Sequence, residues 1–132
     1  MNLLIYAAGG GVALLLLISL LYRSQRGLKS KFYERRWQEI EEMSKNEASW
    51  VQVIIDSDKL LDEALKQSRY NGKTVAERMV SANRAFSDAD GIWRAHKLRN
   101  KVVHENGVKL RQKNIDAALS KYRQALKDLG AL

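Results

Sequence analysis

The chain opens with an unbroken apolar run and continues as a series of amphipathic segments. Residues 3–22 comprise twenty residues without a single charged side chain. A helix of that length rises about 30 Å, which matches the hydrocarbon core of a bilayer. A cleaved signal peptide would end in small residues, whereas this run ends in Leu21, Tyr22 and Arg23. The pattern therefore predicts a transmembrane anchor over residues 1–22.

A second segment, residues 23–44, mixes apolar residues at helical spacing with a cluster of positive charge. Phe32, Trp37 and Ile40 belong to its apolar pattern, which predicts an amphipathic juxtamembrane stalk. Because basic residues follow the apolar run and none precede it, the expected localisation is a single-pass cell-membrane protein with its N-terminus outside and its C-terminal domain cytoplasmic. The lipid bilayer is then one partner, contacted at the membrane surface by Arg23, Arg26, Lys29, Lys31, Arg35 and Arg36.

Residues 45–132 repeat the helical pattern four times, with polar turns between the repeats. Capping-box spacing at residues 44–47 and 74–77 predicts two helix starts, and Ser87 and Asp88 predict a third. Asn106 and Gly107 predict a helix end, after which a last apolar stripe runs to a stop at Gly130. The predicted fold class is all-α, an anchor and stalk followed by a small antiparallel four-helix bundle.

Composition removes several classes of site from consideration. The chain has no cysteine and two histidines, so neither a disulfide scaffold nor a thiolate metal site is expected, and no metal or cofactor is predicted. Gly72, Lys73 and Thr74 superficially match the end of a P-loop. The first glycine of that motif would fall at Gln67, and no apolar strand precedes it, so a turn and a helix cap explain these residues.

Positive charge is again in excess near the C-terminus, around a group of side chains that could bind a phosphate. Residues 94–132 hold ten basic and three acidic residues, whereas residues 37–93 hold seven basic and eleven acidic. Within a helical pattern, Asn100 and His104 are four apart and share a face, and the long side chain of Arg99 can reach round to them. Nucleic-acid binding is predicted for the surrounding residues Lys97, Lys101, Lys109, Arg111 and Lys113.

The same residues carry a family resemblance. Arg99, Asn100 and His104 form an Arg-Asn-x3-His pattern that resembles the signature of HEPN domains, which are small helical bundles. A preceding helix with Asp58 and Asp62, and a turn at residues 70–72, are also similar to that family. The resemblance covers about residues 45–130 and leaves the apolar N-terminus outside it.

The resemblance implies a homodimer with its motif helices facing each other across a shared cleft. In ribonuclease members, the 2′-hydroxyl of RNA attacks the neighbouring phosphate without a metal. When the family's roles are carried over by position, His104 is the acid/base residue, Arg99 binds the phosphate and the transition state, and Asn100 is the polar orienting residue. Other members bind nucleotides or proteins without turnover.

The sequence favours two functions, and a third possibility is a membrane-surface scaffold that uses the polybasic stalk. One is a membrane-anchored HEPN-like domain that binds RNA or a nucleotide and acts as a metal-independent endoribonuclease. The alternative is a noncatalytic, membrane-anchored helical module with a protein partner, in which Arg99 pairs with an acidic neighbour and His104 stabilises its helix end. His96 falls on the apolar face with Ile92 and is predicted to be a packed or hydrogen-bonded core histidine.

Overall fold

The computed structural model describes the backbone of residues 2–132 and the side chains of residues 9–20 and 30–132. Every regular element in this part of the chain is helical, which confirms the predicted helical bundle. The elements are α1 (Asn2–Met43), the 3-10 turn η1 (Glu47–Ser49), α2 (Trp50–Gln67), α3 (Val75–Ser81), the 3-10 turn η2 (Asn83–Ala85), α4 (Ala89–His104) and α5 (Gln112–Asp128).

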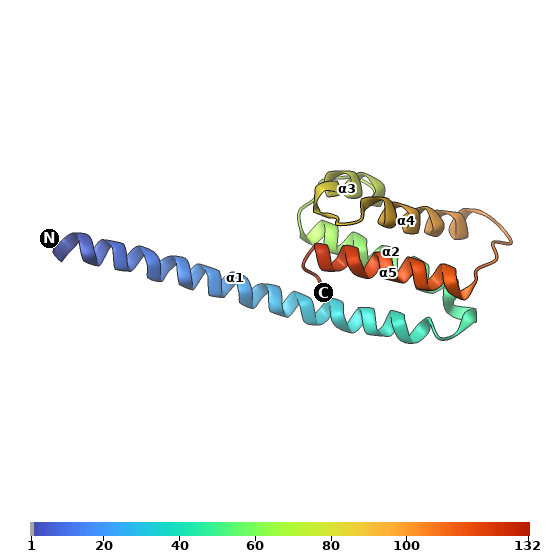
Figure 1. Ribbon diagram of the computed structural model, residues 1–132, viewed down its shortest axis with the longest axis horizontal. Coiled ribbons are helices and arrows are strands. Elements are labelled where there is room, and N and C mark those ends of the chain that lie inside the picture. The colour runs from blue at the N-terminus through green and yellow to red at the C-terminus, as the bar shows by residue number, and fades with distance from the viewer. Residues whose placement is uncertain (1) are drawn as a thin grey trace.

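Four helices form the bundle, but they are not the four that were predicted. The C-terminal part of α1 runs beside the domain, and α2, α4 and α5 follow it in alternating directions (Figure 1). The short α3 lies at one end of the bundle instead of forming one of its long sides. The stretch that was predicted to be a stalk is therefore the fourth long helix of the bundle, in place of the short α3.

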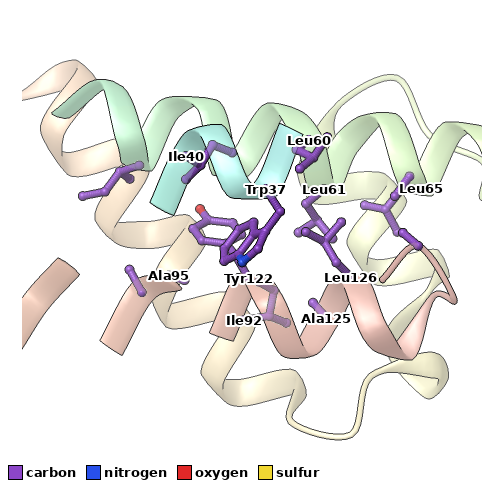
Figure 2. Close-up of a cluster of buried hydrophobic side chains, with 14 of the residues drawn as sticks. Trp37, Ile40, Leu60, Leu61, Leu65, Ile92, Ala95, Tyr122, Ala125 and Leu126 are labelled. Carbon is purple, nitrogen blue, oxygen red and sulfur yellow. The ribbon is translucent and has the colours of Figure 1, made fainter. Parts of the chain in front are cut away.

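The hydrophobic core explains why α1 belongs to the domain. Tyr33, Trp37 and Ile40 recur at helical spacing and are 2–4% exposed. Figure 2 shows Trp37 and Ile40 packed in one cluster with side chains from α2, α4 and α5. Ser30 also donates a hydrogen bond to the Ala131 carbonyl, which ties α1 to the C-terminus. The core thus extends beyond the domain boundary predicted at residue 45.

The helix starts show which polar residues act as caps. Thr74 accepts a hydrogen bond from the Glu77 N–H and Asp88 accepts one from the Gly91 N–H, as the sequence predicted for both starts. Ser44 is not a cap, because its hydroxyl donates to the Glu41 carbonyl at the end of α1. The cap in this turn is Asn46, which accepts from the Ala48 N–H and starts η1.

The predicted transmembrane anchor is contradicted. Over the residues that the structure describes, no helix carries an apolar stretch of the length needed to cross a bilayer. The described part of the predicted anchor, residues 9–20, is exposed. The remainder of the predicted anchor has side chains outside the described residues. The single-pass localisation, which depended on the anchor, is contradicted with it.

The cluster predicted to contact the membrane surface is only partly described. Arg23, Arg26 and Lys29 lie outside the residues whose side chains the structure describes. Lys31, Arg35 and Arg36 are exposed, and Arg36 forms an ion pair with Glu39 at 2.7 Å. These residues belong to the outer side of α1, whose inner side packs into the core.

Candidate functional site

Helix α4 presents two chemically different sides. Ile92, Ala95 and His96 are buried against α2 and α5. Arg94, Lys97 and Lys101 are exposed, and their spacing of three and four residues places them on one outer face. The inner side of α4 therefore has a structural role, and the outer side is available for binding.

A buried polar network occupies the inner side of α4. Its centre is Asp58 of α2, which is 1% exposed. One carboxylate oxygen, Oδ1, lies 2.8 Å from Nδ1 of His96 and accepts a hydrogen bond of 2.8 Å from the Tyr122 hydroxyl. The other oxygen, Oδ2, lies 3.5 Å from Nε of Arg99. One carboxylate thus joins α2, α4 and α5 through three side chains.

Asn100 links His96 to Arg99 within this network. Because Asp58 can only accept as a carboxylate, Nδ1 of His96 is the donor of that bond. Asn100 accepts from Nη1 of Arg99 through its oxygen at 3.0 Å, so its amide nitrogen faces His96 Nε2 at 3.4 Å. His96 is buried and hydrogen-bonded, as predicted.

Tyr122 contributes to the same network as a permanent donor. Burial, together with the Asp58 carboxylate, holds the pKa of the Tyr122 hydroxyl well above its ordinary value of 10.0. The hydroxyl therefore keeps its proton across the physiological range and donates it to Asp58.

The structure brings together two of the three residues predicted to be catalytic. Arg99 contacts Asn100, but neither residue has a hydrogen bond or ion pair to His104 among the described residues. Five positions on a helix turn by about 140°, so Arg99 faces the bundle while His104 faces solvent. The reason is Asp58, which attracts the Arg99 guanidinium inward and partly neutralises it. The predicted convergence of all three side chains is absent within one chain.

The residues predicted to bind nucleic acid are all exposed. Within the described part of the chain none of them takes part in an ion pair. Two lie on the outer face of α4, two in the connection from α4 to α5 and one in the first turn of α5. They are Lys97, Lys101, Lys109, Arg111 and Lys113, and together with Arg94 they are called the basic surface below.

The connection between α4 and α5 is held in a defined conformation. Gly107 has a φ of +71°, a conformation that side chains with a Cβ seldom adopt. Asn114 accepts a hydrogen bond of 2.9 Å from the Arg111 N–H, which fixes the start of α5. Val108 and Leu110 are half-buried, whereas Lys109 between them is exposed. This alternation turns Lys109 and Arg111 outward.

Sequence reasoning missed three residues of this region. Asp58 was noted only as part of the helix similar to HEPN domains, and Tyr122 was assigned to the last apolar stripe. Only contacts between distant helices reveal their shared hydrogen bond. An aspartate on the buried side of α2 was the available signal, because a buried carboxylate requires partners. Arg94 was also missed, although it lies three positions before Lys97 on the same face.

The residues present do not gather into a metal site. Among the described residues, no group of three or more histidine, aspartate or glutamate side chains is placed to hold an ion. Asp58 has its ligand positions taken by hydrogen bonds from protein groups. The chemistry available on the exposed side is that of ammonium and guanidinium groups, which bind anions.

Comparisons with family models, curated proteins and solved structures give no match to this chain. The resemblance to HEPN domains therefore stays a prediction from the sequence.

Proposed function

We propose that this domain binds single-stranded RNA through the basic surface of α4 and the α4–α5 connection. The observation that carries the proposal is the set of six exposed cations, none of which is neutralised by an ion pair within the described residues. Such cations bind phosphate groups and release the counterions condensed on the polyanion, which favours association.

The distribution of acidic residues supports the same surface. Only three of the fifteen acidic residues lie in residues 94–132, where ten basic residues lie. Asp116 is hydrogen-bonded to Gln112, and Asp128 to Ser87 and Gln124. A positive potential over α4 and α5 would steer a polyanion to them.

The resemblance to HEPN domains favours RNA as the polyanion, because RNA and nucleotides are ligands of that group. Asn100 and His104 share one side of α4 and could contact a bound strand, since His104 is exposed and lacks a hydrogen-bond partner among the described residues. Arg99 donates a hydrogen bond to Asn100 and thereby orients its side chain.

The proposal is binding without cleavage. In the predicted mechanism Arg99 stabilises the charge that develops on the phosphate, but its guanidinium is paired with the buried Asp58. Releasing it would take this cation away from a carboxylate that is 1% exposed, which is unfavourable. A cleft shared by two chains would face the same cost in each chain.

The test is fluorescence anisotropy of a labelled single-stranded RNA with the full chain at several salt concentrations. The double variant Lys97→Ala/Lys101→Ala should weaken binding and reduce the slope of log K against log salt by about 1.4, because each phosphate contact contributes about 0.7 for single strands.

The matched control removes two positive charges from another part of the chain. Lys73 precedes α3 and Arg84 lies in η2, at the opposite end of the bundle from the α4–α5 connection, and both are exposed (Figure 1). The variant Lys73→Ala/Arg84→Ala should keep the wild-type slope. Equal losses in both double variants would mean that net charge alone attracts the RNA, and the proposed surface would be rejected.

Turnover is tested separately by incubating the full chain and RNA with EDTA. The account predicts bound, intact RNA. Cleavage that disappears in both Arg99→Ala and His104→Ala, with the helical circular-dichroism spectrum unchanged, would show that the domain is a nuclease and would reject binding without cleavage.

A further inference from the structure

A groove opens between α4 and α5 at the edge of the basic surface. Ala95, Leu98, Ala117 and Ala118 provide its apolar lining, and the small side chains of the three alanines leave space between the two helices. Its volume is about 230 Å³. Cavities that hold drug-sized ligands measure about 300–1,000 Å³, so this groove suits a smaller group.

Polar side chains surround the apolar lining, and two of them are cations. Arg94 belongs to the basic surface and has no ion pair within the described residues. Lys121 forms an ion pair with Asp88 at 2.6 Å, and the Gly91 N–H donates to the other oxygen of that carboxylate. With the Asp88 charge compensated by Lys121, Arg94 leaves this end of the groove positive.

Asn114 adds a directed hydrogen-bond donor. Its carbonyl oxygen is occupied by the Arg111 N–H at 2.9 Å, which leaves the amide N–H groups for another partner. No hydrogen bond from that amide nitrogen is found among the described residues. The groove thus combines apolar walls, one free donor and one free cation.

We propose that the groove receives a single unpaired base of the RNA bound by the basic surface. This inference rests on the proposed function and gives a reason for the preference for single strands, because a base in a duplex is stacked and paired and cannot enter the groove. The base packs against Ala95, Leu98 and Ala118, Asn114 donates to a base oxygen, and Arg94 binds the adjoining phosphate.

The groove can be filled without altering charge. Ala117 lines it from α5 but is exposed, so a larger side chain at this position need not enter the core. Leucine is also a good helix former. The variant Ala117→Leu therefore removes space for the base and keeps every cation. Ser120, exposed on the same helix and outside the groove, gives the matched control Ser120→Leu.

The experiment measures the affinity of the full chain for one labelled RNA strand, free and annealed to its complement. Wild type should bind the free strand more tightly than the duplex. Ala117→Leu should weaken binding of the free strand about tenfold, the size of effect expected for losing one base contact, and should leave duplex binding unchanged. Ser120→Leu should match wild type with both RNAs. Thermal unfolding checks the fold, and Ala117→Met is a second, more flexible filler.

Each contrary outcome rejects a defined part of the account. If Ala117→Leu leaves both affinities unchanged, or lowers them equally, the groove holds no base, although the basic surface still binds RNA. If wild type binds neither RNA, the groove and the proposed function are both rejected.

Discussion

At the scale of single residues, Asp58 is the group on which the polar interior depends. Its carboxylate accepts from Tyr122 and His96 and lies beside Arg99, so residues from three helices share one buried acceptor. Removing one member of such a network leaves the others buried without partners, which costs more than the loss of an average hydrogen bond.

Asp58→Ala should lower the free energy of unfolding by about 3–5 kcal/mol, because the Tyr122 hydroxyl, His96 and Arg99 would all lose the carboxylate. Chemical denaturation followed by circular dichroism measures this loss. The control is Asp56→Ala on the same helix, where the side chain bonds only to exposed Gln52. It should cost less than about 1 kcal/mol. Equal effects at the two positions would contradict the assigned role of Asp58.

Arg99 shows how far residue spacing can be interpreted. The sequence placed Arg99, Asn100 and His104 within reach of one another on a helix, and the contact between Arg99 and Asn100 is present. It could not indicate which side of the helix would be buried at Arg99, because that depends on a carboxylate forty-one positions earlier. A long-range ion pair therefore decided where the guanidinium lies.

At the scale of elements, α2 and α3 are joined by one guanidinium. Nε and Nη2 of Arg78 bond to the two oxygens of Asp62 at 2.6 and 3.0 Å, while Nη1 donates to the Gly72 carbonyl at 2.6 Å. Burial alone would raise the pKa of Asp62, but the hydrogen bonds from Arg78 and Lys66 outweigh it and lower the pKa below the ordinary value of 3.8.

This link predicts a pH dependence of stability. Because the folded pKa of Asp62 is lowered, its contribution is present above about pH 4 and is lost as the pH falls through the folded pKa. Asp62→Asn should therefore lower the thermal midpoint at about pH 7 and differ little from wild type at about pH 2. Asp116→Asn, at an exposed site on α5, serves as the control. A difference for Asp62→Asn that is the same at both pH values would contradict the ion pair.

The elements themselves were predictable where local chemistry decides them. Thr74 and Asp88 cap the helices they were expected to cap, and Gly130 follows the end of α5 with a φ of +75°. The start of α2 was placed wrongly, because Ser44 bonds back into α1 and its carbonyl accepts from the Trp50 indole N–H. Packing of Trp50 on the preceding turn thus outweighs the capping-box spacing.

At the scale of the whole molecule, the helical bundle could be predicted from the sequence, but the helices that form it could not. The apolar stripe of Tyr33, Trp37 and Ile40 was assigned to a stalk because it follows the predicted anchor, whereas it is buried in the core. The same emphasis on the N-terminal apolar run led to the anchor that the described helices contradict. The periodicity of the sequence correctly identified the apolar side of this helix, but it could not identify which part of the molecule covers that side.

The distribution of charge over the molecule carries the central claim, which is that α4 and the α4–α5 connection bind RNA. Amide hydrogen exchange of the full chain, with and without single-stranded RNA, tests it most directly. The account predicts added protection concentrated in residues 94–113. Protection concentrated in α3 and η2, or unchanged exchange throughout residues 94–113 at saturating RNA, would contradict it.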